Sequence, residues 1–314
     1  MDIIDSSWNA TTKRLYKYHL LNWDKFINEH FLHKDCITID MVLDYLLFLY
    51  ESGLGYSSIN TARSALSSEI FCDGVPAGSH PLVIRFMTGI FKLRPSLPKY
   101  TTTWDPQVVL KMLSKWYPNS KLSLTKLTLK LVTIIALITG QRLQTVHLLK
   151  LSNMVKTDSA ITFAITDIIK TTKKGSHIEP IVFKRYREDD TLCVVKVLRE
   201  YIKRTQVHRS NKDKLFLTTV KPYQEASKNT LARWVKTTLA LSGIDTKKFS
   251  AHSTRSASTS YVSKFVPTSV ILKAANWSSS NTFAKFYNKP IARPSFAETM
   301  LKGSSKKKKG GGDK

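Results

Sequence analysis

The sequence predicts a mainly α-helical protein with one small β-hairpin or sheet, folded as two domains. Most of the chain has apolar residues at helical spacing, whereas residues 151–184 place alternating β-branched residues on both sides of a Lys- and Gly-rich turn. A Pro- and Thr-rich stretch at 93–106 separates a shorter N-terminal part from a longer C-terminal part. The 314 residues include 42% hydrophobic and 10% aromatic side chains, enough for each part to bury its own core.

Residues 1–98 are predicted to form a helical N-terminal domain. Apolar residues at helical spacing run from Trp8 to His30, and Thr38 or Asp40 can cap the apolar helix that follows. The next helix is expected to end near Asp73 and Gly74, a pair typical of turns. We expect helices in this domain at 8–30, 41–50, 59–71 and 80–89.

Residues 99–302 are predicted to form a larger α+β domain. The sequence AITFAITDII, the turn KTTKKG and the sequence HIEPIVF together indicate the hairpin. The segment 303–314, GSSKKKKGGGDK, is of low complexity and is expected to be a disordered basic tail; the sequence leaves open whether this tail is native. We expect helices at 105–116, 122–138, 141–149, 190–204, 229–241, 252–265, 268–275 and 279–288.

The chain is strongly basic, and the excess lies in one part of it. Lys and Arg number 49 against 23 Asp and Glu, a formal net charge of +26. Residues 1–100 hold 10 basic and 10 acidic residues, so residues 101–314, with 39 and 13, carry the whole excess. This charge predicts a polyanionic partner, most commonly nucleic acid, that binds mainly through the C-terminal part. General solubility or attraction to a membrane surface is the alternative interpretation.

Cysteine usage and hydropathy argue against a secreted or membrane-anchored protein. Cys36, Cys72 and Cys193 match no zinc spacing and no disulfide framework, which favours a reducing compartment. The first residues are acidic where a secretory signal would be basic. The longest apolar run, 131–139, is too short to span a bilayer, so no membrane partner is expected.

Three segments carry residues suited to phosphate chemistry. In AHSTRSASTSYVSKF, His252 and Arg255 are three residues apart and share one face of a helix, where an imidazole and a guanidinium could meet one phosphate. Arg142 directly follows the helix break at Gly140, and is either a surface residue or a charge delivered from a buried helix. Trp277 and Tyr287 follow in ILKAANWSSSNTFAKFYNKP. The alternatives are a polar surface helix for the first segment and core packing for the aromatic residues.

The order of these motifs resembles the tyrosine recombinase or phage integrase family. The order is ITGQR, a hairpin containing Lys, HSTR, NW and FY, and it covers about residues 105–300. The segment from HSTR to FYNKP is most similar to recombinases of eukaryotic DIRS-like mobile elements. The resemblance implies a helical core-binding domain, which clamps DNA, and an α+β catalytic domain. It also implies double-stranded DNA as the partner and, for a eukaryotic element, a nuclear location.

The resemblance also assigns catalytic roles. Tyr287 matches the nucleophile, Trp277 a position that family members fill with His or Trp, and the hairpin turn the place of a catalytic lysine. We assign that lysine to Lys170, with Lys173 and Lys174 as alternatives. The six predicted catalytic residues are Arg142, Lys170, His252, Arg255, Trp277 and Tyr287.

The chemistry implied is transfer of a DNA strand to the protein and back. The phenol of Tyr287 attacks a backbone phosphorus and forms a 3′-phosphotyrosine, leaving a free 5′-hydroxyl. A free phenol has a pKa of about 10 and is a poor nucleophile, so two guanidiniums nearby would favour the phenolate and stabilise the transition state. Lys170 would protonate the 5′-oxygen, and His252 would position or deprotonate the phenol. The reaction implies no ATP, and no acidic cluster of the sequence suggests a metal, so no cofactor is expected.

Two other functional classes remain compatible with the sequence. A type IB topoisomerase shares this chemistry but relaxes supercoils as a monomer, and a domesticated or structural DNA-binding protein would not cleave at all. The family resemblance implies a tetramer on two DNA duplexes. Ser295 can cap a final short helix with Phe296, Met300 and Leu301 on one face. That helix either docks on a neighbouring subunit or packs on its own domain.

Overall fold

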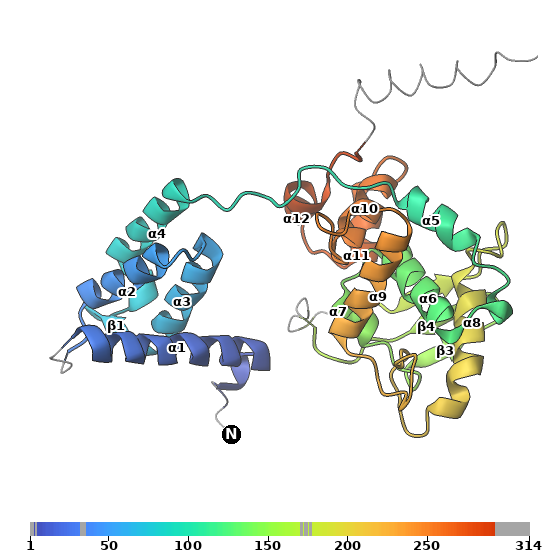
Figure 1. Ribbon diagram of the computed structural model, residues 1–314, viewed down its shortest axis with the longest axis horizontal. Helices are drawn as coiled ribbons and strands as arrows, with labels where there is room; N and C mark the ends of the chain where they lie inside the picture. Colours follow the sequence, from blue (N-terminus) through green and yellow to red (C-terminus); the bar gives the residue numbers. More distant parts are fainter. Residues whose placement is uncertain are drawn as a thin grey trace, which may run out of the picture. The chain divides into compact units, whose positions relative to one another are not determined.

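The computed structural model describes residues 3, 5–31, 36–169, 172, 175 and 178–292. The chain divides into two compact units, Met1–Pro98 and Lys99–Lys314, each with its own hydrophobic core (Figure 1). The boundary lies within the Pro- and Thr-rich segment 93–106. Helices dominate both units and the sheets are small, so the predicted fold class is confirmed.

The first unit packs its helices around a core that includes the fully buried Tyr45, Leu46 and Ile59. Thr38 caps the second helix by accepting a hydrogen bond from the Met41 backbone N–H, as expected of a residue at this position. Asp73 and Gly74 do not end a helix as predicted. They form the turn of a two-residue hairpin, with positive φ at both positions. The α-helices and strands are α1 Ala10–His30, α2 Ile39–Glu51, α3 Tyr56–Glu69, β1 Phe71–Cys72, β2 Val75–Pro76 and α4 Pro81–Leu93.

The second unit is built around a central helix, α6 (Leu124–Thr139), which packs against α8, α9 and α10 (Figure 1). Every residue of α6 from 127 to 137 is buried, as expected of a helix that is mostly apolar on all sides. Ser123 caps it by accepting from the Lys126 backbone N–H. The other helices are α5 Pro106–Ser114, α7 Leu143–His147, α8 Val194–Thr205, α9 Lys228–Leu241, α10 Ser253–Val262, α11 Thr268–Ala275 and α12 Ser280–Thr282, followed by a π-helical turn, Phe283–Tyr287.

The predicted hairpin is present as two strands of an antiparallel sheet with the order β3-β4-β5. Strands β4 (Ala160–Phe163) and β5 (Ile181–Lys184) pair along their lengths, and β3 (Met154–Lys156) adds a third strand that was not predicted. The first predicted strand, AITFAITDII, is shorter than expected. Beyond Phe163, Asp167 pairs with Lys150 instead of continuing the ladder.

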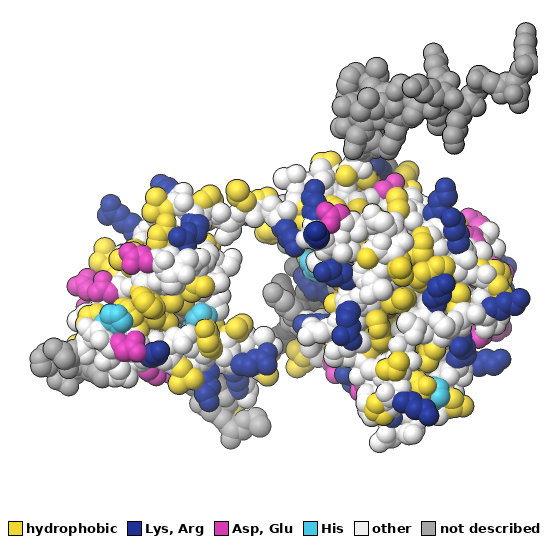
Figure 2. All heavy atoms as spheres, viewed as in Figure 1, with side chains coloured by type: hydrophobic (Ala, Val, Ile, Leu, Met, Phe, Trp, Pro, Cys, Tyr) yellow, Lys and Arg dark blue, Asp and Glu magenta, His cyan; other side chains and the backbone are white. Residues whose placement is uncertain are grey.

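Lys and Arg side chains are spread over the face of the second unit shown in Figure 2. This agrees with the charge count, which places the whole positive excess in residues 101–314. Among the residues described, no helix combines the length and the apolar character needed to cross a membrane.

Candidate active site

Arg142 enters the site through a sharp turn at the end of α6. Gly140 ends that helix with φ 58°, a left-handed conformation that glycine adopts at little cost. A Cβ at this position would also lie 3.2 Å from the Cγ2 of Thr259. The turn leaves Arg142 half-buried as the N-cap residue of α7. The central buried helix therefore supports this arginine, which is the second of the two interpretations of the sequence.

Arg255 is the largest fully buried side chain among the described residues, with 1% of its surface exposed. One terminal nitrogen, Nη2, donates to the Ala275 carbonyl at the end of α11, at 2.7 Å. The Nε and Nη1 atoms are buried and have no hydrogen-bond partner in the structure. Buried donors are rarely left unpaired, so these two nitrogens mark a place where an acceptor is expected to bind.

Burial, together with the charge of Arg142, lowers the pKa of Arg255 to about 10. The guanidinium therefore stays charged at neutral pH. Within the described part of the chain no carboxylate pairs with this buried charge, and its two free donors suit an anion that brings its own negative charge.

His252 and Tyr287 contact each other directly. His252 precedes the first residue of α10, and its Nε2 lies 3.2 Å from the Tyr287 hydroxyl. Although His252 is accessible to solvent, desolvation of its ring lowers the pKa, and the charges of Arg255 and Arg142 lower it further. The imidazole is therefore neutral at neutral pH and can accept the phenolic proton.

Trp277 closes the apolar side of the site. Its ring centroid lies 4.6 Å from that of Tyr287, and the Arg255 guanidinium carbon lies 4.2 Å from the Trp277 ring centroid. The indole Nε1 is buried, and none of the described residues is its hydrogen-bond partner. Because that N–H only donates, it adds a third unpaired donor to the two on Arg255.

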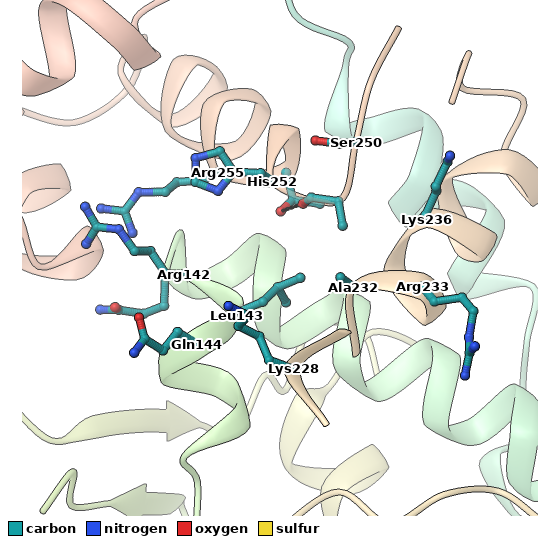
Figure 3. A pocket seen from close by; sticks show the side chains of 13 residues that line it. Arg142, Leu143, Gln144, Lys228, Ala232, Arg233, Lys236, Ser250, His252 and Arg255 are labelled. Atoms are coloured by element: carbon teal, nitrogen blue, oxygen red, sulfur yellow. Dashed lines mark hydrogen bonds between the residues drawn. The ribbon is translucent and has the colours of Figure 1, made fainter. Parts of the chain in front are cut away.

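A cleft of about 510 Å³ opens beside His252 and the two arginines. Figure 3 shows the guanidinium groups of Arg142 and Arg255 extending to the same side, with Lys236 and Arg233 of α9 on the other side. The polar and charged side chains that line the cleft include Gln141, Arg142, Gln144, Lys228, Arg233, Lys236, His252 and Arg255. The cleft therefore carries positive charge from the two arginines to α9.

The chain after Tyr287 is hydrogen-bonded to the beginning of the second unit. The Thr103 backbone N–H donates to the Pro290 carbonyl at 2.8 Å, and the Ala292 N–H donates to the Thr103 carbonyl at 2.6 Å. The Lys289 ammonium donates to the Tyr100 carbonyl at 2.9 Å. These bonds hold residues 289–292 in place within the same unit.

The structure brings together five of the six predicted catalytic residues: Arg142, His252, Arg255, Trp277 and Tyr287. Lys170 and its alternatives Lys173 and Lys174 lie outside the described residues, as do the predicted final helix and the tail. The predicted helix 279–288 is a short α-helix followed by a π-helical turn, in which Phe283 is buried and Phe286 is 56% exposed.

Sequence reasoning missed the basic residues of α9 and the buried serines of α10. Lys228, Arg233 and Lys236 line the cleft, and their placement on one helix before HSTR was the available signal. Ser256 and Ser260 bond to the Tyr287 backbone, and only their spacing of four residues could have suggested a common face. No group of three or more His, Cys, Asp or Glu side chains that could hold a metal occurs in the described part of the chain.

Replacing Arg142 with glutamine should raise the pKa of His252 toward the ordinary value of 6.5 without reaching it. Removing the positive charge relieves one cause of the lowered pKa, while desolvation, the largest cause, remains. An NMR titration of the His252 ring measures the shift in the absence of DNA. The matched control, Lys285→Gln, removes an exposed charge from another element and should leave the titration unchanged. An unchanged pKa in Arg142→Gln would contradict the described electrostatics.

Comparison with solved structures places the same fold in several DNA-bound proteins. The XerH site-specific recombinase, in a post-cleavage complex with palindromic difH substrate, matches with a TM-score of 0.61 and 16% identity over 93% of this chain and 78% of that chain. The Tn1549 transposon integrase, in complex with transposon right end DNA, matches at 0.57 and 14%, over 94% and 98%. A lambda integrase (75–356) dimer bound to a COC′ core site matches at 0.53 and 17%, over 91% of each chain.

The sequence itself matches a family model over residues 107–292. This range contains all five site residues described above and most of the second unit. A comparison with curated proteins gave no match. Because the family model covers more than half of the chain, and the fold agrees with it, the chain belongs to the phage integrase family.

Proposed function

We propose that this protein is a site-specific DNA recombinase that cleaves and rejoins DNA through a covalent 3′-phosphotyrosine formed by Tyr287. The observation that carries the proposal is the 3.2 Å contact between the Tyr287 hydroxyl and a neutral His252, beside the unpaired donors of Arg255. A phenol, a proton acceptor and a buried cation with free N–H groups are what attack on a phosphodiester requires.

In this proposal the phenol oxygen of Tyr287 forms a bond to phosphorus while the bond from phosphorus to the 5′-oxygen breaks. The phenolic proton passes to His252, and Lys170 gives a proton to the departing 5′-oxygen. Arg142 and Arg255 donate to the non-bridging oxygens as charge develops on them, and the Trp277 N–H is a further donor to one of these oxygens. One phosphodiester replaces another of similar energy, so rejoining is the same reaction reversed and requires no ATP.

Two lines of support lie outside the five residues. The positive excess in residues 101–314 and the basic lining of the cleft suit a double-stranded DNA substrate. The structural relatives named above are complexes of recombinases or integrases with DNA, one of them from a transposon. We propose that this protein mobilises a transposable element, of the DIRS-like kind that its motifs resemble, and acts in the nucleus.

Incubation with a nicked duplex that traps the intermediate tests the proposal. We expect a protein–DNA adduct that survives denaturation, with the DNA joined through its 3′ end and a free 5′-hydroxyl on the released strand. Recombination between paired sites then supports a recombinase, whereas relaxation of supercoiled DNA without any site requirement supports the type IB topoisomerase alternative. Binding without an adduct would instead indicate a DNA-binding protein that does not cleave.

The substitution Lys170→Ala should abolish cleavage of ordinary DNA. The same variant should still cleave a substrate with a 5′-bridging phosphorothiolate. A thiolate leaves without a proton, so the variant loses only the step that Lys170 provides. Lys173→Ala and Lys174→Ala are the matched controls from the same turn and should cleave both substrates. If one of these controls needs the sulfur substrate while Lys170→Ala does not, the general acid is that lysine instead.

We propose assembly as a tetramer on two DNA duplexes, with the segment after Arg293 docking on a neighbouring subunit. A lambda integrase tetramer bound to a Holliday junction shares the fold, with a TM-score of 0.53. Sedimentation of protein truncated after Arg293, with paired sites, tests the docking. Truncation should leave binding to one duplex intact and weaken the paired complex, and a full-sized complex at unchanged concentration would rule the docking out.

A further inference from the structure

The backbone carbonyl of Tyr287 accepts two side-chain hydrogen bonds from α10. The Ser256 Oγ donates to it at 2.9 Å and the Ser260 Oγ at 2.6 Å. Both serines are almost fully buried, with 2% and 3% of their surfaces exposed. They are four residues apart and so lie on the same face of the helix. One face of α10 therefore holds the main chain of the residue that carries the phenol.

The Ser260 hydroxyl also accepts a hydrogen bond from the Lys289 backbone N–H at 2.9 Å. It thus binds the main chain on both sides of Asn288. Tyr287 is the last residue of the π-helical turn, where carbonyls lack a partner from the next turn of helix. One donor would satisfy such a carbonyl. Two buried donors and a third bond beyond it restrict its direction as well as its position.

The same helix carries the groups that Tyr287 must meet. His252 immediately precedes α10, and Arg255 lies on it, next to Ser256. A rigid helix therefore sets the distance from the phenol to its proton acceptor through two connections. One is the contact of the His252 ring with the Tyr287 hydroxyl, and the other is the pair of hydrogen bonds from the serines to the Tyr287 carbonyl.

We propose that Ser256 and Ser260 are positioning residues that hold Tyr287 in its attacking geometry through its backbone carbonyl. The inference rests on the function proposed above. Without the two bonds, the contact between His252 and the Tyr287 hydroxyl is left without support from the Tyr287 backbone, and the phenol moves relative to His252 and Arg255. A misplacement of about 1 Å costs on the order of 100-fold in rate when a reaction depends on orientation.

The test compares Ser256→Ala, Ser260→Ala and the double variant with Ser258→Ala. Ser258 is the matched control, since it is a buried serine of the same helix whose hydroxyl donates to the Arg255 carbonyl within α10, at 3.4 Å, and not to the Tyr287 backbone. The first measurement needs no DNA: the nuclear Overhauser effect between the rings of His252 and Tyr287. We expect it in the wild type and in Ser258→Ala, and expect it to weaken in each single variant and vanish in the double variant.

The second measurement is the single-turnover rate of cleavage at saturating DNA. The double variant should cleave about 10- to 100-fold more slowly with unchanged DNA affinity, because orientation and not binding is lost. Ser256→Thr, which keeps a hydroxyl, should recover most of the rate lost by Ser256→Ala. If the double variant does not fold, each single variant still has one of the two bonds and gives the same comparison.

The outcomes separate this inference from the proposed function. A double variant that keeps the ring contact overturns the positioning role, whatever its cleavage rate. A lost ring contact with an unchanged cleavage rate overturns it as well. If the wild type forms no adduct with any nicked duplex, the proposed function fails, while the ring contact still decides whether the serines position Tyr287.

Discussion

Tyr287→Phe should abolish covalent attachment to DNA while DNA affinity stays unchanged. The cleavage rate should fall by at least about 10⁴-fold, as is usual when a nucleophile is removed. The substitution removes one oxygen and leaves the ring that packs at 4.6 Å on Trp277. The bonds from Ser256 and Ser260 reach the backbone carbonyl, so they persist in the variant. The measurement is denaturing electrophoresis of protein incubated with a nicked duplex.

The control for this substitution is Tyr261→Phe, which removes a hydroxyl from a half-buried tyrosine of α10. It should form the adduct at the wild-type rate. Equal melting temperatures for the variants would show that the fold is intact. A Phe variant at position 287 that still became covalently attached to nicked DNA would show that another residue is the nucleophile.

Arg255→Ala should reduce the cleavage rate by about 10²- to 10³-fold, the typical cost of removing a preorganised donor to a developing negative charge. Two of its three guanidinium nitrogens are buried and unpaired, so the side chain is held ready for an anion by its single bond to Ala275. Single-turnover cleavage at saturating DNA measures the loss. Arg255→Lys should recover only part of it, because an ammonium cannot make the forked contact of a guanidinium.

Arg209→Ala is the matched control for a buried arginine. Arg209 is 3% exposed, but it donates to the carbonyls of Lys214 and Leu215 and to the Thr205 hydroxyl, all within the protein. Its loss should lower the melting temperature more than the loss of Arg255, since it leaves buried acceptors unpaired. Folded Arg209→Ala protein should cleave at the normal rate. Near-normal cleavage by folded Arg255→Ala protein would show that Arg255 does not take part in cleavage.

Most helices could be predicted from the sequence because their signals are local. Apolar residues recur every three to four positions, and Thr38 and Ser123 occupy cap positions next to them. The alternation of β-branched residues predicts the hairpin, but it does not predict the length of the first strand. Asp167 pairs with Lys150, 17 residues away, and that contact interrupts a pattern that otherwise continues to alternate.

The types and order of the site residues were also determined by the sequence alone. Arg142, His252, Arg255, Trp277 and Tyr287 were chosen from their motifs, and the charge asymmetry placed the expected DNA contact in the C-terminal part. The charge asymmetry follows directly from composition, whereas the catalytic roles of the five residues follow from the resemblance of their ordered motifs to the tyrosine recombinase family. The family match over residues 107–292 agrees with that choice of region.

Only the tertiary structure decided how these groups face one another. The Ser256 and Ser260 bonds to Tyr287 join residues 31 and 27 positions apart, and Lys289 meets Tyr100 across 189 positions. Which nitrogens of Arg255 stay unpaired depends on where α11 ends, because the Ala275 carbonyl accepts a hydrogen bond from only one of them. Such contacts follow from the packing of helices around α6, and periodicity along the chain carries no information about which distant side chains that packing brings together.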